Sequence, residues 1–271
     1  MDTSVIAAYN RTRDPAARDL PCHAPFTTLR LGTTGQVTPC CYNHTDLSSP
    51  GAPGDLEAAW RGDALKALRA ELRAGRLPAS CHQCTDQLQA GNFHGTMARN
   101  YDYHARKTHG VVDPPTPRVL ELEISNRCNL QCEMCLGLYS SSIRQHRDGL
   151  PPLETPGVDD LPARIAPWLP HLDRIAFAGG EPLLIEPYYA LWERLAELAS
   201  PPEVFLVTNG TTLPRRAKAL FEAQRIHVTV SIDALDPAVY ARIRRGADLT
   251  TVLEHTAWYR DYTRRKGTIL C

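Results

Sequence analysis

The chain has 271 residues, enough for one large domain or two modest ones, and its 43% hydrophobic content can supply a substantial core. Its 30 basic and 30 acidic residues cancel, so the charge does not indicate a nucleic-acid-binding protein. No stretch approaches the roughly 18 apolar residues of a membrane span, and residues 1–10 lack the apolar core of a signal peptide. Eight of nine cysteines fall in groups with metal-ligand spacing, which argues against a secreted disulfide framework and predicts a cytoplasmic protein.

The N-terminal region, residues 1–110, is predicted to form a small α+β domain. The segment 26–37 alternates apolar and polar residues around a turn, which predicts a β-hairpin. Because the arms of a hairpin are antiparallel, it would bring Cys22 close to Cys40. Apolar residues at helical spacing then predict one helix over 56–72.

Four cysteines of this region have the spacing of a metal site. Cys81 and Cys84 form a C-x2-C pair, and the hairpin would add Cys22 and Cys40. Spacing alone leaves structural zinc and an iron–sulfur cluster equally open. Cys41 is the spare thiol of the group, although it could replace Cys40 as the ligand.

A proline-rich segment, 111–118, predicts a stiff linker, and residues 119–271 alternate strands with helices. Such alternation implies a parallel sheet with crossover helices, either open or curled into a barrel. The predicted strands are Val119–Ile124, Arg174–Ala178, Val204–Thr208 and His227–Ile232, and the predicted helices are Pro187–Ala199, Pro214–Gln224 and Leu249–Arg265. Residues 268–271 are expected to begin a further strand.

The first of these strands leads into a C-x3-C-x2-C array, Cys128, Cys132 and Cys135. Three thiolates can hold three irons of a [4Fe–4S] cube and leave the fourth iron without a protein ligand. Clusters used only for electron transfer usually take four cysteines, so the open iron indicates a site for something else. The alternatives are a redox dithiol or a zinc site, with His146 as the nearest fourth ligand.

This array, with Met134 before its last cysteine, resembles the signature of the radical S-adenosylmethionine (radical SAM) enzymes. The resemblance implies that SAM chelates the open iron of a [4Fe–4S] cluster at Cys128, Cys132 and Cys135. The reduced cluster would cleave SAM to a 5′-deoxyadenosyl radical, which abstracts a substrate hydrogen. An external electron donor of the flavodoxin or ferredoxin type is therefore expected.

The ends of the later strands resemble SAM-binding motifs of the same family. The cofactor-binding residues implied are Gly179, Gly180, Glu181, Asn209, Ser231 and Arg244. The Gly-Gly-Glu triplet matches the motif that contacts the amino group of SAM. Arg244, with Arg242 as the alternative, would pair with the SAM carboxylate.

The N-terminal cysteines resemble the SPASM/twitch module, which carries auxiliary [4Fe–4S] clusters beside a radical SAM core. A full SPASM module has more cysteines and a second cluster, so the one-cluster twitch form fits better. The module normally follows the core, whereas here it precedes the core. The resemblance therefore predicts an α/β chain with a partial (β/α) barrel of radical SAM type, preceded by a small α+β twitch-like iron–sulfur domain.

Two features of the core concern the substrate. Glu121 and Glu123 alternate with apolar residues in the first strand and are expected to point into the barrel, for substrate binding, proton transfer or a salt bridge. The segment 139–170 is too long for an ordinary connector and is expected to form part of the substrate mouth. The strands are fewer than in the family barrel, so the chain is either a fragment or a fold completed by other means. Cys271 has no assigned role.

The leading hypothesis is a radical SAM oxidoreductase or maturase that oxidatively modifies a peptide. A dehydrogenase or epimerase of a sugar or aminocyclitol is the second interpretation. A non-catalytic iron–sulfur or zinc scaffold is the rival from another class, but a scaffold has no reason to carry the SAM-binding motifs. The expected partners are a peptide or small-molecule substrate and the electron donor, with no nucleic acid and no membrane.

Overall fold

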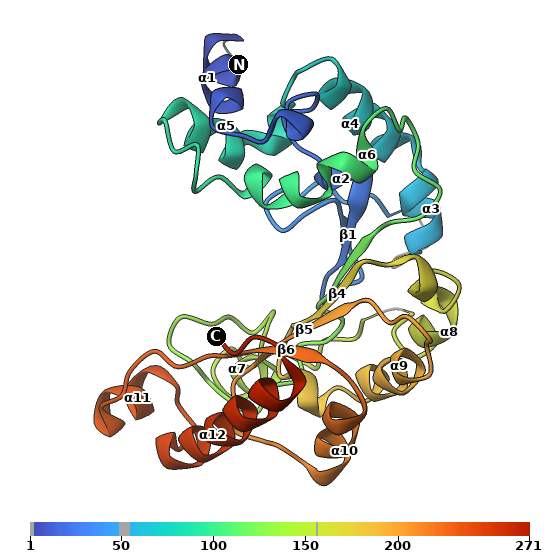
Figure 1. Cartoon of the computed structure of the whole chain (residues 1–271). Helices are drawn as coiled ribbons and strands as arrows, with labels where there is room; N and C mark the ends of the chain where they lie inside the picture. Colours follow the sequence, from blue (N-terminus) through green and yellow to red (C-terminus); the bar gives the residue numbers. More distant parts are fainter. Residues whose placement is uncertain (1–2, 49–54, 156) are drawn as a thin grey trace. The chain divides into compact units, whose positions relative to one another are not determined.

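The computed structural model describes residues 3–48, 55–155 and 157–271. The chain divides into two compact units, one of Met1–Arg30 with Gln36–Val119 and the other of Leu31–Gly35 with Leu120–Cys271 (Figure 1). The boundaries expected from the sequence, 1–110, 111–118 and 119–271, stay predictions. In the parts of the chain that are described, no helix has the length and apolarity needed to cross a membrane.

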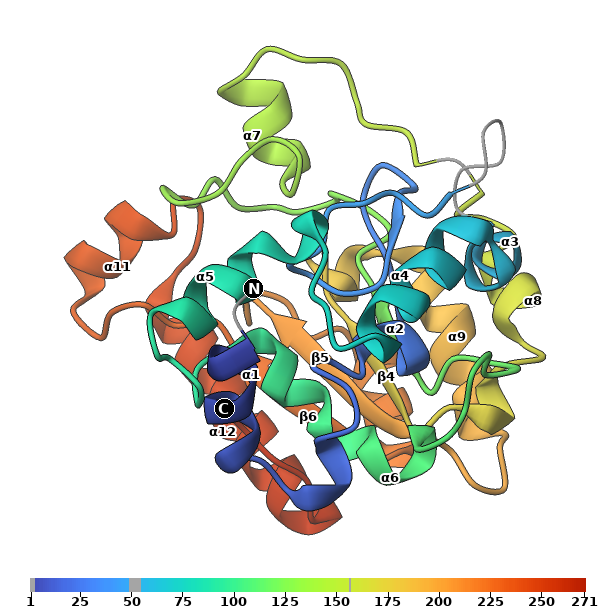
Figure 2. The same cartoon turned by 90° about the horizontal axis from the view of Figure 1, so that it is seen from above.

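Short helices dominate the first unit. The α-helices are α1 (Thr3–Arg11), α2 (Ala24–Thr27), α3 (Leu56–Arg61), α4 (Asp63–Arg73), α5 (His82–Gln89) and α6 (Ala105–Thr108), and the 3-10 helices are η1 (Pro15–Ala17), η2 (Ala79–Cys81) and η3 (Met97–His104). Helices α1 and α5 lie side by side (Figure 2). The strands β1 (Thr28–Leu31) and β2 (Val37–Thr38) are neighbours, as the hairpin prediction requires, but residues 26 and 27 belong to α2.

The prediction of a single helix over 56–72 is wrong, because Gly62 separates α3 from α4. Gly62 adopts an extended backbone, with φ −70° and ψ 156°. A Cβ at this position would lie 2.9 Å from the carbonyl oxygen of Ala58, so the break needs a glycine. Leu56 and Trp60 before the break and Leu65 after it are all buried, and this continuous apolar pattern concealed the interruption.

The second unit alternates strands with helices. Its strands are β3 (Val119–Leu122), β4 (Arg174–Phe177), β5 (Glu203–Thr208) and β6 (Ile226–Val230), and its helices are α7 (Ser141–His146), α8 (Leu161–Ile165), η4 (Leu169–His171), η5 (Pro182–Leu184), α9 (Glu186–Ala196), α10 (Arg215–Ala223), α11 (Pro237–Ile243) and α12 (Leu249–Lys266). The strands follow one another in the order β3-β4-β5-β6, and β4, β5 and β6 are parallel. Leu270 forms a further parallel bridge with Val228, which confirms the pairing expected for the last residues.

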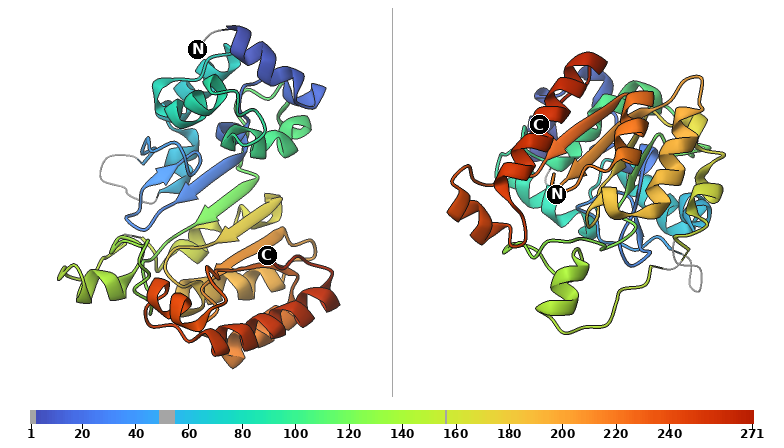
Figure 3. Two further views of the ribbon diagram at one scale, coloured as in Figure 1. Left: turned by 90° about the vertical axis from the view of Figure 1, so that its left-hand side faces the viewer. Right: turned by 90° about the horizontal axis from the view of Figure 1, so that it is seen from below.

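Helices α9, α10 and α12 cover one face of the strands β4 to β6 (Figure 3). Tyr188 and Trp192 of α9 pack edge-on against Phe177 of β4, with ring centroids 4.9 and 5.4 Å away. Alternate residues of β5, namely Val204, Leu206 and Thr208, are buried. The predicted α/β class is therefore confirmed. The helices pack on the face of the sheet and leave the carboxyl ends of the parallel strands open to polar side chains.

Candidate metal centres

A cavity of about 220 Å³ lies at the carboxyl ends of β4, β5 and β6. It is lined by Cys128, Cys132, Cys135, Gly179, Gly180, Asn209, Ser231 and Arg244, which are all the site residues predicted for this unit except Glu181. Carboxyl strand ends are where parallel β/α folds place their chemistry. We call the three cysteines with this cavity the open site, since the cavity leaves room beside the sulfurs.

The two glycines of the open site pack against the backbone that leads into Cys128. The N–H of Gly180 donates to the carbonyl of Ser125 at 2.9 Å, and the N–H of Glu181 donates to the carbonyl of Arg127 at 2.8 Å. A Cβ on Gly180 would lie 2.3 Å from the Arg127 oxygen. Glycine is therefore required here by the close approach of two backbone segments.

Two serines hold the cysteine loop on its other side. The Oγ of Ser141 accepts from the N–H of Cys128 and donates to its carbonyl, each at 3.1 Å. The Oγ of Ser140 donates to the carbonyl of Leu130 at 2.6 Å and also caps α7. Ser140 and Ser141, which belong to the segment 139–170 expected at the substrate mouth, thus orient the loop, while Tyr139 lines the cavity.

The connection between α11 and α12 also binds the cysteine loop. The N–H of Gln131 donates to the carbonyl of Arg245 at 2.9 Å, and the N–H of Glu133 donates to the carbonyl of Ile243 at 2.8 Å. Arg245 and Glu133 also form a 2.8 Å ion pair, in which both side chains are exposed. The cysteine loop is therefore held on both sides by hydrogen bonds to its backbone. Helix α11, which supplies one of these contacts, was not predicted from the sequence.

Asn209 connects the end of β5 to the first cysteine. Its Nδ2 donates to the Oδ1 of Asn129 at 3.1 Å and lies 3.8 Å from the Sγ of Cys128. Its Oδ1 accepts from the N–H of Thr211 at 2.9 Å, which fixes the orientation of the amide. Ser231 reaches the same cavity because its N–H donates to the carbonyl of Thr208 at 2.9 Å.

Glu181 lies behind the cavity, fully buried. Its carboxylate accepts from the N–H of Leu183 at 3.1 Å, the hydroxyl of Thr208 at 2.8 Å and the N–H of Asn209 at 2.7 Å. Burial raises the pKa of Glu181 to about 7, although these three donors oppose the rise. In this arrangement the carboxylate joins the end of β4 to the end of β5.

The two candidate arginines occupy different environments. Arg244 lines the cavity, donates from Nε to Asp233, and places Nη1 4.0 Å from the Sγ of Cys132. Arg242 is exposed and does not line the cavity. The geometry therefore favours Arg244 as the cation of this site.

Two of the three thiols of the open site, Cys128 and Cys132, have raised pKa values. Burial, reinforced by the charges of Glu181 and the other two cysteines, raises the pKa of Cys128 to about 11. Burial also raises the pKa of Cys132, while Arg244 opposes the rise. A metal that takes these sulfurs as thiolates would displace their protons, so its binding is coupled to proton release.

The other four predicted ligands meet in the first unit. Cys22, Cys40, Cys81 and Cys84 line one small, largely apolar cavity, which we call the four-thiol site. Cys22 directly precedes α2, Cys40 follows β2, and Cys81 and Cys84 lie at the start of α5. Cys41 does not line this cavity, so the geometry favours Cys40 over its neighbour.

Burial also affects the pKa of thiols at the four-thiol site. It raises the pKa of Cys22 well above its usual value and the pKa of Cys40 to about 12. All of these cysteines are free thiols. His146, the histidine considered as a fourth ligand, is exposed and lines neither cavity.

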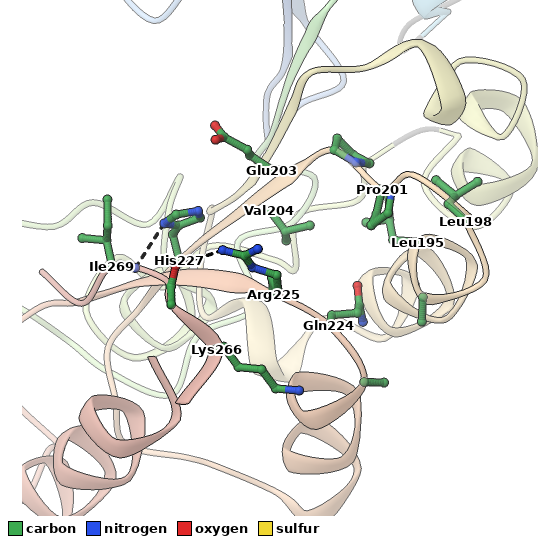
Figure 4. A pocket seen from close by; sticks show the side chains of 14 residues that line it. Leu195, Leu198, Pro201, Glu203, Val204, Gln224, Arg225, His227, Lys266 and Ile269 are labelled. Atoms are coloured by element: carbon green, nitrogen blue, oxygen red, sulfur yellow. Dashed lines mark hydrogen bonds between the residues drawn. The ribbon is translucent and has the colours of Figure 1, made fainter. Parts of the chain in front are cut away.

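A larger cavity, of about 600 Å³, lies at the opposite ends of the strands, beside the start of β5 and β6 (Figure 4). Gln224, Arg225, His227 and Lys266 contribute polar groups to it, but no cysteine does. The larger cavity is therefore not the one that the predicted site residues line.

Two family models match the chain. Residues 122–271 match the model described as "Radical SAM superfamily", and residues 22–85 match the one described as "Iron-sulfur cluster-binding domain", named SPASM. The first match covers the open site and the second covers all four cysteines of the four-thiol site.

Curated relatives share part of this sequence. A GTP 3′,8-cyclase of Mycobacterium ulcerans is 36% identical over 138 residues, which are 51% of this chain and 37% of the relative. A GTP 3′,8-cyclase of Alkaliphilus oremlandii is 30% identical over 135 residues, which are 50% of this chain and 41% of the relative. The aligned region thus spans about two fifths of these relatives' length.

Solved structures show weaker likeness. Streptococcus suis SuiB bound to S-adenosylmethionine is 15% identical, with a TM-score of 0.45 over 78% of this chain and 49% of that one. The protein anSMEcpe with bound AdoMet is 20% identical, with a TM-score of 0.40 over 56% of this chain and 42% of that one.

The residues present fit the groups that these families imply. At the open site, three free thiols and a cavity could hold a three-cysteine [4Fe–4S] cluster together with a ligand at its fourth iron. At the four-thiol site, four free thiols, of which Cys22 and Cys84 are buried, could supply every corner of a cube. In the described parts of the chain, no group of three or more cysteine, histidine or carboxylate side chains has the arrangement of a single-ion metal site.

Proposed function

The chain belongs to the radical SAM superfamily, and from this premise we propose that it removes two hydrogens from a peptide substrate. The cofactors are a [4Fe–4S] cluster, SAM and an auxiliary iron–sulfur cluster. Reductive cleavage of SAM supplies a 5′-deoxyadenosyl radical, the group that takes the first hydrogen atom.

The residues of the open site would bind and orient these cofactors. Cys128, Cys132 and Cys135, which line the cavity, would hold the cluster. Arg244 would pair with the carboxylate of SAM, for which it would exchange its present partner Asp233. Asn209 and Ser231, at the ends of β5 and β6, would donate hydrogen bonds to the same molecule.

One observation supports oxidation in particular: the chain carries a closed four-thiol site as well as the open one. Abstraction of one hydrogen atom leaves a substrate radical, and an oxidised product requires that a second electron and a proton leave. A cluster held by four cysteines has no open iron and is suited to electron transfer. The four-thiol site would therefore accept that electron.

The substrate class is part of this proposal. We expect a peptide, with a sugar or aminocyclitol as the second candidate. The relatives named GTP 3′,8-cyclase share only about two fifths of their length with this chain, so their substrate is not carried over to it.

The test uses the anaerobically reconstituted chain with SAM, dithionite and three classes of substrate: peptides encoded beside its gene, aminocyclitols and GTP. We expect a peptide alone to increase 5′-deoxyadenosine formation and to lose the mass of two hydrogens. Consumption of an aminocyclitol or of GTP, with no change in any peptide, would overturn the peptide assignment.

The matched control is a variant that lacks two ligands of the four-thiol site. A Cys81→Ala/Cys84→Ala variant should still form 5′-deoxyadenosine but should not release the oxidised peptide. Normal yields of oxidised peptide from this variant would contradict the electron-accepting role of the four-thiol site.

A further inference from the structure

Asn43, which lies outside the cysteine motifs of the sequence, is in the wall of the four-thiol site. It is 2% exposed. Its Nδ2 donates to the Oγ of Ser80 at 3.1 Å and lies 3.4 Å from the Sγ of Cys81, within the range of an N–H···S hydrogen bond.

The orientation of this amide is fixed by its other end. The Oδ1 of Asn43 accepts from the N–H of Thr45 at 2.9 Å. Because a backbone N–H can only donate, the oxygen must face Thr45 and the NH2 group must face Cys81. The donor is therefore held against the sulfur by burial and by two further hydrogen bonds.

Asn43 also reaches a second predicted ligand. Its backbone pairs with Cys40 in an antiparallel bridge, and a hydrogen bond from its N–H lowers the pKa of the Cys40 thiol against the larger effect of burial. One residue thus touches two sulfurs that come from separate segments of the chain. Cys22 receives its hydrogen bond from the backbone N–H of Ala24, at 3.4 Å, which a side-chain substitution leaves in place.

We propose that Asn43 sets the reduction potential of the auxiliary cluster through its hydrogen bond to the sulfur of Cys81. Hydrogen bonds to cluster sulfurs are one of the factors that set the potential of an iron–sulfur cluster. Reduction adds one electron to the cluster and makes its sulfurs richer in negative charge. The partial positive charge of the Asn43 N–H stabilises that reduced state, so it raises the potential and makes the cluster a better electron acceptor.

This inference depends on the auxiliary cluster and not on the identity of the substrate. It is tested on the full chain, reconstituted anaerobically with both clusters and titrated with dithionite while EPR follows each signal. The SAM-binding cluster is recognised by its response to added SAM. Iron content is measured for every variant.

Two substitutions remove the donor. Asn43→Leu keeps the approximate shape, and Asn43→Asp keeps the oxygen that accepts from Thr45. We expect the auxiliary cluster to shift to a more negative potential in both variants, by more in the aspartate variant, while the SAM-binding cluster keeps its potential. The control Asn92→Asp adds the same charge at an exposed position of the same unit and should shift neither signal. An unchanged auxiliary potential in either Asn43 variant would overturn the proposal.

A measurement on the unsubstituted protein covers the case in which both variants lose the cluster. With ¹⁵N in the side-chain amide of asparagine, pulsed EPR of the reduced auxiliary cluster should detect a coupled amide nitrogen. The absence of that coupling would contradict a hydrogen bond from Asn43 to the cluster.

Discussion

The two cysteine sites place similar thiols in opposite settings. In the four-thiol site the four cysteines line a small apolar cavity, with Pro25, Leu72 and Tyr101 in its wall. In the open site three sulfurs share a cavity of about 220 Å³ with glycine backbone, an amide and an arginine. The contrast indicates that the surroundings and number of the thiols decide whether a further ligand can reach the metal.

The sites also differ in how their ligands are positioned. The open site takes its cysteines from one loop, which is held by backbone hydrogen bonds to the end of β4 and to the α11–α12 connection. The four-thiol site takes its cysteines from three separate segments that the packing of the unit brings together. A local substitution should therefore affect the two sites independently.

The strongest predicted effect separates the two sites. Replacing Cys128, Cys132 and Cys135 by alanine should abolish 5′-deoxyadenosine formation and lower the iron content from about eight to about four per chain. The Cys81→Ala/Cys84→Ala variant should lose the same amount of iron but keep SAM cleavage. Iron analysis and chromatography of the products check both variants, and equal loss of cleavage in both would refute the division of labour.

The next effect tests the close backbone approach at the open site. Gly180→Ala should displace the segment that leads into Cys128, because its Cβ would lie 2.3 Å from the Arg127 oxygen. We expect the open-site cluster to be lost and the auxiliary cluster to remain. Gly149→Ala is the control, since no atom lies within 4 Å of the position its Cβ would take and its positive φ of 64° costs only about 1 kcal/mol. Full cluster loading of Gly180→Ala would count against the packing argument.

The third effect concerns the buried carboxylate. Burial raises the pKa of Glu181 from 4.5 to about 7, so the folded chain holds this proton more tightly than the unfolded chain does. Its contribution to stability is therefore fully present below pH 4.5 and is lost as the pH rises to about 7, by at most about 3 kcal/mol.

Glu181→Gln should not show this dependence. The difference in unfolding free energy between the unsubstituted chain and Glu181→Gln should thus change across that pH range and level off above it. Thermal unfolding of both proteins from about pH 4.5 to about pH 8 measures it. Parallel stability curves would mean that Glu181 does not titrate in this window.

The weakest effect distinguishes the two arginines. Arg244→Gln should weaken SAM binding about tenfold, the loss expected for one charge-assisted hydrogen bond in a partly exposed site. Arg242→Gln should leave the affinity unchanged, because that side chain is exposed and outside the cavity. Equilibrium dialysis with labelled SAM compares the two variants, and the reverse ranking would move the role to Arg242.

Sequence reasoning predicted the β/α core well, because apolar strands and amphipathic helices alternate there with clear boundaries. It also predicted which residues gather at the strand ends, since parallel strands bring their carboxyl ends together. Gly179 and Gly180 illustrate the limit of such reasoning. Their motif indicated a ligand, whereas their immediate contact in the structure is the chain's own backbone.

Features that depend on tertiary packing were not accessible from the sequence. The break at Gly62 interrupts no apolar pattern, and the backbone bonds from Gln131 and Glu133 to the α11–α12 connection involve no particular side chain. The proposed role of Asn43 depends on a sulfur that lies 38 positions away along the chain, so no local pattern indicates it.

Mössbauer spectroscopy of the anaerobically reconstituted chain, with and without SAM, would decide whether the protein has an open and a closed site. We expect two [4Fe–4S] clusters, of which one changes its spectrum when SAM is added and the other does not. A single cluster, or two clusters that both ignore SAM, would contradict the assignment of the two sites.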